Sequence, residues 1–200
     1  MARASGPGLS PFRGSLPLAT RRYRPVLAAM ADFVSLPAWE HPTNVWLGAI
    51  WLEALVLTES GGDPKAVRYE PHQDVPGRRD SASDGDKPGQ DDGLLEDDKS
   101  YGLLQVMGSN IRRLCGVGPG VPMQFGFALL PLTNLALGLR VLLEDLETVE
   151  GDIPRALARY NGGPTGTSLV PGPGGALVYR RQEYVDKVAK NAVLVFQDRY

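Results

Sequence analysis

The chain has 200 residues and a formal net charge of −2, which is enough for one domain with a hydrophobic core plus an extension. Hydrophobic residues make up 42% and charged residues 22% of it, as in an ordinary globular protein, and the weak negative charge gives no basis for nucleic-acid binding. Cys115 stands alone, which excludes an intramolecular disulfide, and two distant histidines argue against a His/Cys metal site. No apolar run reaches the length of a membrane span, because Glu53 interrupts the longest one.

The N-terminal 40 residues differ in composition from the rest. Residues 1–20 are rich in Gly, Pro and Ser and carry no acid, which predicts an irregular arm. Pro25 and Asp32 interrupt the next apolar stretch and argue against a signal peptide. We expect residues 1–40 to be an extension that packs on the domain or docks to a partner protein; docking is favoured because residues 1–20 look unable to fold alone. A short helix within it would have an apolar stripe of Tyr23, Val26, Leu27, Met30 and Phe33.

A helix that ends at two glycines carries the most unusual acid of the chain. It is expected to start near Thr43 or Asn44, both good N-caps, and to end at Gly61–Gly62, where a left-handed backbone is favoured. Glu59 would lie in the last turn, where the negative end of the helix dipole and an apolar surround disfavour a charged carboxylate. Both effects raise the pKa of Glu59, as a general acid working near neutral pH requires. The alternative, a solvated Glu at a helix end, is the commoner case.

An acidic stretch of low hydrophobicity follows this helix. Residues 68–70 are predicted to be extended, with room for a small hairpin around the acidic loop 75–99. Asp84-Gly85-Asp86 suggests a calcium loop, but the register fails at Pro88 and Leu95, where ligands should stand. We therefore expect this loop to be a solvated, flexible lid.

The remaining sequence predicts helices separated by short or Gly/Pro-rich segments. After the apolar segment 100–107, Ser109 is expected to cap a brief helix. Thr133 or Asn134 is expected to start the clearest helix of the chain, which ends at Gly151. Its buried face would consist of Leu135, Leu139, Leu142, Leu146 and Val149.

Two further helices complete a predominantly helical domain. Asp152 is expected to cap a helix that ends at Tyr160–Gly163. Residues 162–175 contain six Gly and three Pro and predict a long surface loop. The last helix, about residues 176–196, would turn Tyr184, Val188 and Val195 inward.

Three glycine-flanked motifs, ESGGDPKAV, SYGLLQVM and ALARYNGG, occur in this order along the chain. Together they resemble the lytic transglycosylases of the soluble, goose-type-lysozyme-like fold, over roughly residues 45–192. The resemblance implies a mainly α, lysozyme-like (α+β) transglycosylase domain over residues 41–200, with an irregular N-terminal extension and the acidic loop as an insertion. The segments AVRYEP and YVDKV resemble phage-associated members of the family.

The same resemblance assigns the site residues. Glu59 matches the family's catalytic acid, and Tyr160 matches a tyrosine that faces it. The implied substrate-binding residues are Ser60, Ser100, Gln105, Met107, Tyr160 and Asn161.

The reaction that the resemblance implies requires no metal and no cofactor. Glu59 would protonate the glycosidic oxygen between N-acetylmuramic acid and N-acetylglucosamine. It would then remove the proton of the muramic C6 hydroxyl, so that an anhydro ring closes and water is not the nucleophile. The nearest alternative is a hydrolytic lysozyme on the same fold, in which Glu70 or Asp74 would place a water. A structural or assembly protein that keeps a lysozyme-like module is the other alternative.

The expected partners are peptidoglycan glycan strands and phage-tail or other assembly proteins bound through the N-terminal extension. We expect neither nucleic-acid binding nor a membrane span. The expected location is the tail of a phage virion acting in the host cell envelope, and the alternative is the bacterial periplasm or cell surface.

Overall fold

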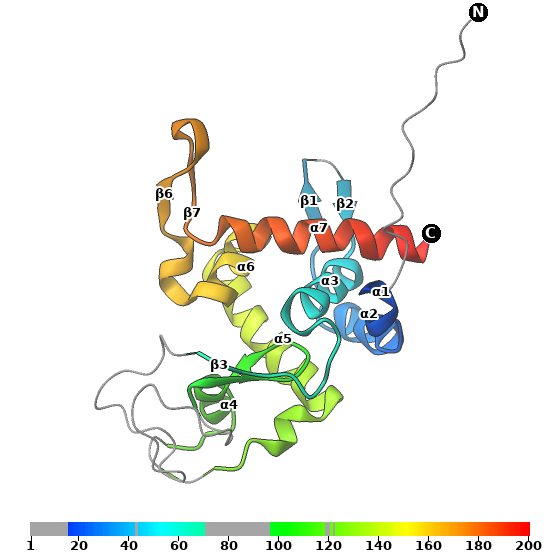
Figure 1. Cartoon of the computed structure of the whole chain (residues 1–200), viewed down its shortest axis with the longest axis vertical. Helices are drawn as coiled ribbons and strands as arrows, with labels where there is room; N and C mark the ends of the chain where they lie inside the picture. Colours follow the sequence, from blue (N-terminus) through cyan, green and yellow to red (C-terminus); the bar gives the residue numbers. More distant parts are fainter. Residues whose placement is uncertain (1–15, 43, 71–96, 119–120, 122) are drawn as a thin grey trace, which may run out of the picture.

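The computed structural model describes residues 16–42, 44–70, 97–118, 121 and 123–200. These residues form a mainly helical body with three small antiparallel sheets, which confirms the predicted architecture (Figure 1). The helices are α1 (Leu16–Arg21), α2 (Arg24–Phe33), α3 (Gly48–Ser60), α4 (Gly108–Leu114), α5 (Pro131–Thr148), α6 (Ile153–Gly162) and α7 (Gln182–Arg199). The sheets are β1 (Trp39–His41) with β2 (Asn44–Trp46), β3 (Val67–Tyr69) with β4 (Lys99–Tyr101) and β5 (Val106–Met107), and β6 (Leu169–Pro171) with β7 (Leu177–Tyr179). Across these described ranges, no helix has both the length and the apolar character needed to cross a membrane.

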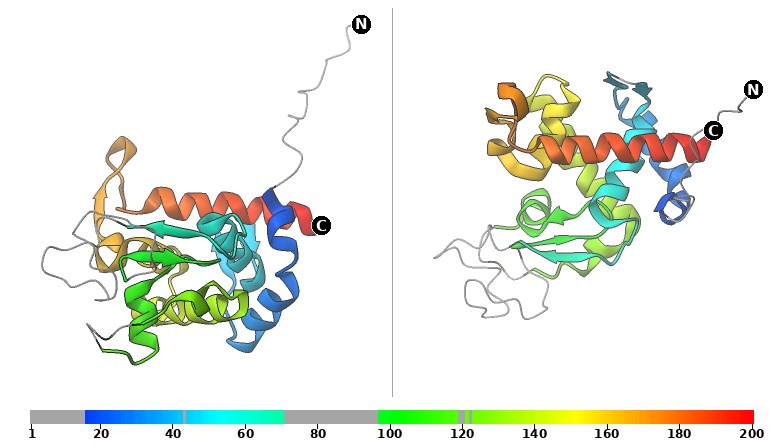
Figure 2. Two further views of the ribbon diagram at one scale, coloured as in Figure 1. Left: turned by 60° about the horizontal axis from the view of Figure 1, so that its bottom comes forward. Right: turned by 45° about the horizontal axis from the view of Figure 1, so that its top comes forward.

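Helix α3 is the centre of the molecule. Its side chains from Ile50 to Glu59 are buried on every face, as expected for a helix that is apolar all round. α7 runs across one side of α3, and the β3–β5 sheet with α4 lies on the side away from α7 (Figures 1 and 2). The helix ends as predicted, because Gly61 takes the left-handed conformation at its C-cap.

The start of α3 was predicted incorrectly. The helix begins at Gly48, and Asn44 belongs instead to the hairpin that β1 and β2 form before it. Trp39 and Trp46 are directly opposite each other in this hairpin and both are buried, with ring centroids 5.1 Å apart. This aromatic cross-strand pair stabilises strands where capping residues alone had suggested a helix start.

The segment before the hairpin packs on α3. Helix α2 buries Leu27 and Ala31, and its N-cap Tyr23 is also buried, so the predicted short helix exists. Phe33 is 90% exposed, and its predicted place in the apolar stripe is wrong, because the helix turns it away from Leu27 and Ala31. The predicted irregular arm is wrong at its C-terminal end, since residues 16–21 form α1; residues 1–15 lie outside the described residues.

A buried acid connects both ends of the chain to α3. Glu53 is 0% exposed and accepts hydrogen bonds from Thr20 Oγ1 at 2.8 Å and from Arg24 Nε at 2.9 Å. It also accepts a bond of 2.6 Å from Arg199 Nη2 near the end of α7. A buried carboxylate is tolerated only when it is paired in this way, so Glu53 depends on residues from α1, α2 and α7.

Helix α5 provides the second part of the core. Its leucine face is buried as predicted, at Leu135, Leu139, Leu142, Leu146 and the following Val149. The helix begins at Pro131, so the prediction that Thr133 or Asn134 caps it is wrong. Asn134 is fully buried and bonds to the Leu104 amide (2.8 Å) and the Tyr101 carbonyl (2.7 Å), and it thereby holds the loop between β4 and β5.

The predicted hairpin around the acidic loop is present. β3 pairs with β4 so that Val67 is opposite Tyr101, which confirms the extended conformation expected near residues 68–70. Residues 71–96 lie outside the described residues, and with them the predicted lid and the calcium alternative at residues 84–86.

The chain after α6 contains more regular structure than predicted. In place of a long loop over residues 162–175, a 3-10 helix (Gly163–Thr167) leads into β6, which pairs with β7. This hairpin projects from the body (Figure 1), and α7 begins only at Gln182. The alternation of aliphatic residues around a Gly/Pro turn is the signal of such a hairpin, and the glycine content concealed it.

Candidate active site

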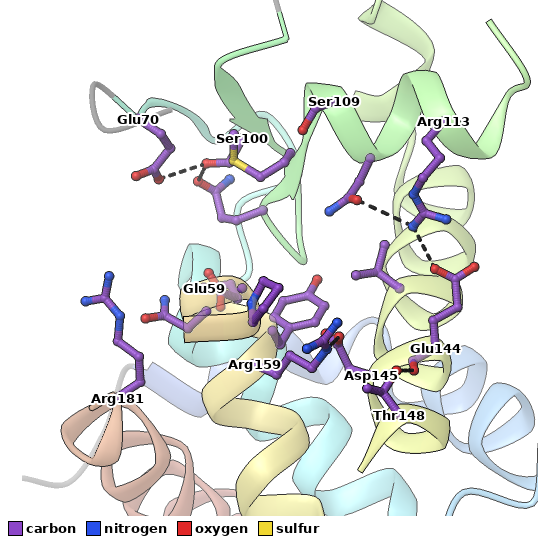
Figure 3. A pocket seen from close by; sticks show the side chains of 18 of the residues that line it. Glu59, Glu70, Ser100, Ser109, Arg113, Glu144, Asp145, Thr148, Arg159 and Arg181 are labelled. Atoms are coloured by element: carbon purple, nitrogen blue, oxygen red, sulfur yellow. Dashed lines mark hydrogen bonds and ion pairs between the residues drawn. The ribbon is translucent and has the colours of Figure 1, made fainter. Parts of the chain in front are cut away.

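A polar cleft of about 730 Å³ opens beside the C-terminal end of α3. Residues from α3, the β3–β5 sheet, α4, α5 and α6 line it, together with Arg181 just before α7 (Figure 3). Glu59 lies at this cleft, as do Ser100, Gln105 and Met107. Tyr160 and Asn161 also line it, so the structure brings together all the predicted site residues except Ser60.

Glu59 is the acid that this arrangement isolates from solvent. Its side chain is only 7% exposed, and burial raises its pKa to about 7. A hydrogen bond from Tyr184 and the charges of Arg68 and Lys187 act in the opposite direction, because they favour the carboxylate. The predicted upward shift is therefore confirmed. Near neutral pH, Glu59 can both donate and accept a proton.

The hydroxyl of Tyr184 donates a hydrogen bond to Glu59 Oε1. From the sequence, Tyr184 was expected to turn inward only as a core residue of the last helix. Tyr160 was expected to face Glu59, but its hydroxyl donates to the Leu104 carbonyl at 2.7 Å. The tyrosine that holds the acid thus comes from α7, and Tyr160 instead connects α6 to the loop between β4 and β5.

A second layer of hydrogen bonds shapes the floor of the cleft. Gln105 Nε2 donates to the carbonyls of Gly102 (2.9 Å) and Ala66 (3.1 Å), and Gln105 Oε1 accepts from Ser100 Oγ at 3.0 Å. Gln105 has a φ of 46°, a left-handed conformation that is unfavourable for a side-chain-bearing residue and recurs at functional sites. The side-chain amide of Gln105 therefore fixes the β4–β5 loop, and Ser100 and Gln105 lie side by side at the cleft.

Ser60 occupies a different position from the one predicted. It is not among the residues that line the cleft, and its Oγ donates to the Leu103 carbonyl at 2.9 Å. The same oxygen accepts a bond from the Gly62 amide at 3.1 Å. These contacts fix the end of α3 against the β4–β5 loop, so the position of Ser60 gives no support to sugar contact.

The wall opposite Glu59 consists of ion pairs that sequence analysis missed (Figure 3). Arg113 Nη2 lies 2.6 Å from Glu144, and Arg159 Nε lies 2.7 Å from Asp145. Burial raises the pKa of Asp145 to about 6, although the charge of Arg159 opposes that shift. The only sequence signal was that Glu144 and Asp145 interrupt the leucine pattern of the long helix, which solvent exposure explains equally well.

In the parts of the chain that the structure describes, no three or more His, Cys, Asp or Glu side chains are placed to hold a metal ion. The cleft contains one buried acid with a raised pKa, a tyrosine that donates a hydrogen bond to it, and walls lined by polar side chains. Such a site can transfer a proton to and from a bound polysaccharide.

A model of the family described as the transglycosylase SLT domain matches residues 46–168, which is more than half of the chain. The chain belongs to this family. No curated protein and no solved structure matches it. The SLT match covers Glu59 and every other predicted site residue, and family membership makes a peptidoglycan glycan strand the implied substrate. It ends before β6, so Arg181 and Tyr184 lie outside the stretch that identifies the SLT domain.

Proposed function

We propose that this SLT domain is a peptidoglycan lytic transglycosylase that cleaves the β-1,4 bond between N-acetylmuramic acid and N-acetylglucosamine and leaves an anhydro-muramic end. The observation that carries the proposal is the state of Glu59. It is a buried carboxyl group with a pKa near 7 that lies in a cleft and accepts a hydrogen bond from Tyr184.

The first step uses the protonated form of Glu59. Its proton passes to the glycosidic oxygen, the bond from that oxygen to C1 of the muramic ring breaks, and N-acetylglucosamine leaves with a free 4-hydroxyl. Positive charge then develops at C1, where the substrate's own acetamido group can shield it. Burial favours this step because it keeps the acid protonated near neutral pH.

The second step uses the carboxylate that the first step leaves. Glu59 accepts the proton of the muramic C6 hydroxyl, O6 bonds to C1, and a 1,6-anhydro ring closes, which returns Glu59 to its acid form. Tyr184 stabilises the carboxylate between the two steps, because its hydroxyl donates to Oε1. One carboxyl group therefore serves both steps.

The direct test of the site is release of soluble fragments from purified peptidoglycan by the wild type and by Glu59→Gln. The amide keeps the size of the side chain but cannot donate the proton, so we expect activity to fall by a factor of about 10³ or more. Arg180→Gln is a matched surface control, because Arg180 is exposed and does not line the cleft. Full activity in Glu59→Gln would refute the assignment.

A hydrolytic lysozyme is the second candidate, because another carboxyl group lies at the cleft. Glu70 lines it, and Glu70 Oε1 is 3.4 Å from Ser100 Oγ. A hydrolase needs such a group to hold the attacking water. Glu70→Gln should abolish cleavage if the enzyme is a hydrolase and leave most of it if O6 of the substrate is the nucleophile. Asp74, the other predicted candidate, lies outside the described residues.

For the biological setting we propose a phage virion, with the enzyme in the tail acting on the host envelope. The support is the resemblance of the AVRYEP and YVDKV segments to phage-associated members. We place the proposed anchor to a tail protein in residues 1–15, because α1 and α2 pack on the body. Deletion of residues 1–15 should leave activity intact and abolish incorporation into virions; unchanged incorporation would refute the anchor.

A further inference from the structure

We propose that Arg181 is a carboxylate-binding residue of the cleft and selects the acidic groups of the muramic half of the substrate. The proposal rests on the proposed function, which supplies a substrate with carboxylates near the cleaved bond. Those carboxylates come from two sources. The lactyl group of muramic acid is a free carboxylate when the peptide stem is absent, and the stem has carboxylates of its own when it is present.

The position of Arg181 is the first support. It directly precedes α7 and lines the same cleft as Glu59. Figure 3 shows its side chain extending along the side of the cleft where Glu59 is labelled, away from the ion pairs of Arg113 and Arg159. A guanidinium group in this position can meet a group carried by the sugar whose bond Glu59 cleaves.

The packing of its aliphatic stem is the second support. Gly162 has φ −117° and ψ 8°, which a residue with a side chain can adopt. A Cβ at position 162 would lie 2.7 Å from Arg181 Cγ, closer than real contacts permit, and 3.0 Å from its Nε, which is also a tight contact. The absence of a side chain at position 162 therefore leaves the space against α6 that the exposed stem of Arg181 fills.

The charge balance of the cleft is the third support. Arg113 and Arg159 each pair with a carboxylate of α5. Arg68 donates from Nη2 to the Glu59 carbonyl at 3.2 Å. Among the described residues, the Arg181 guanidinium has no hydrogen-bond or ion-pair partner, and its stem lies against Gly162. A positioned arginine with free parallel donors matches the geometry of a carboxylate.

The experiment measures binding by titration calorimetry in the Glu59→Gln background, so that the substrate is not consumed. The ligands are a muramic-acid-containing tetrasaccharide with its peptide stems, the same tetrasaccharide without them, and chitohexaose, an amino-sugar chain without carboxylates. We expect Arg181→Gln to weaken binding of a carboxylate-bearing ligand about tenfold or more and to leave chitohexaose binding unchanged. Weaker binding of the stem-bearing tetrasaccharide would show that Arg181 binds a carboxylate of the peptide stem. Weaker binding of the tetrasaccharide without stems would show that it binds the lactyl carboxylate.

Two further variants make the result specific. Arg180→Gln removes the neighbouring charge, which does not line the cleft, and should change none of the three affinities. Gly162→Ala keeps the charge but displaces the arginine stem, and should reproduce the selective loss. Equal weakening for all ligands, or no difference between Arg181→Gln and Arg180→Gln, would overturn the proposal. If the wild type does not cleave peptidoglycan but selective binding is present, the proposed function fails while the carboxylate site stands.

Discussion

Replacement of Tyr184 by Phe should move the pH dependence of cleavage to higher pH. The variant removes only the hydroxyl that donates to Glu59 Oε1, and this bond lowers the pKa of Glu59 against the larger effect of burial. A hydrogen bond to a charged group contributes ~1.5–3 kcal/mol, and one pKa unit corresponds to about 1.4 kcal/mol. Part of the bond persists with the protonated acid, so we expect the pKa of Glu59 to rise by about one unit.

The sign of the effect on rate follows from the role of the acid. Glu59 must be protonated for the first step, so kcat/KM of the wild type should fall as pH rises through about 7. In Tyr184→Phe the fall of kcat/KM should occur about one pH unit higher. At pH 6, where both proteins keep the proton, the variant should be about tenfold slower, because the carboxylate formed in the first step loses its donor.

The assay is the initial rate of fragment release from purified peptidoglycan between pH 5 and pH 9. Tyr160→Phe is the matched control, because that hydroxyl donates to the Leu104 carbonyl and not to Glu59. Its pH dependence should keep the midpoint of the wild type. An unchanged midpoint in Tyr184→Phe, or the same shift in both variants, would refute the role given to Tyr184.

Three further predictions concern stability. Because the folded-state pKa of Glu59 is raised from 4.5 to about 7, the unfolding free energy falls by about 3 kcal/mol as pH rises through this interval. Glu59→Gln should therefore raise the unfolding free energy at pH 8 but not at pH 4. Equal effects of the substitution at both pH values in urea denaturation would contradict the raised pKa. Glu53→Ala leaves Arg24 and Arg199 without their buried partner and should lower the unfolding free energy by about 3–5 kcal/mol in the same assay. Asn134→Leu removes the acceptor of the Leu104 amide and a donor to the Tyr101 carbonyl. The variant should lower the unfolding free energy by about 1–3 kcal/mol and reduce activity. A melting temperature equal to that of the wild type would contradict this role of Asn134.

Local sequence signals were sufficient to predict α3. The apolar residues before Glu59 and the glycines after it predict a buried helix with an acid in its last turn, and both features depend only on neighbours along the chain. The leucine face of α5 was predictable for the same reason. A period of 3.6 residues is a property of the helix itself and does not depend on its partners.

The contacts that complete the site join residues far apart in sequence. Tyr184 and Glu59 are separated by 125 residues, and helical periodicity could show only that Tyr184 turns inward. Asn134 is a residue type that often caps helices, but the Leu104 amide and the Tyr101 carbonyl that it binds lie 30 and 33 residues earlier in the chain. Polar residues can serve as caps or as buried clamps, and only the tertiary structure decides between them.

In the proposed reaction, one carboxyl group cleaves the glycan and the substrate's own C6 hydroxyl closes the anhydro ring. Mass spectrometry of peptidoglycan digested in H₂¹⁸O by the wild type and by Glu59→Gln tests it most directly. We expect anhydro-muramic ends without ¹⁸O in the wild-type digest and no newly formed ends in the variant digest. Reducing muramic ends labelled with ¹⁸O would contradict it and identify a hydrolase.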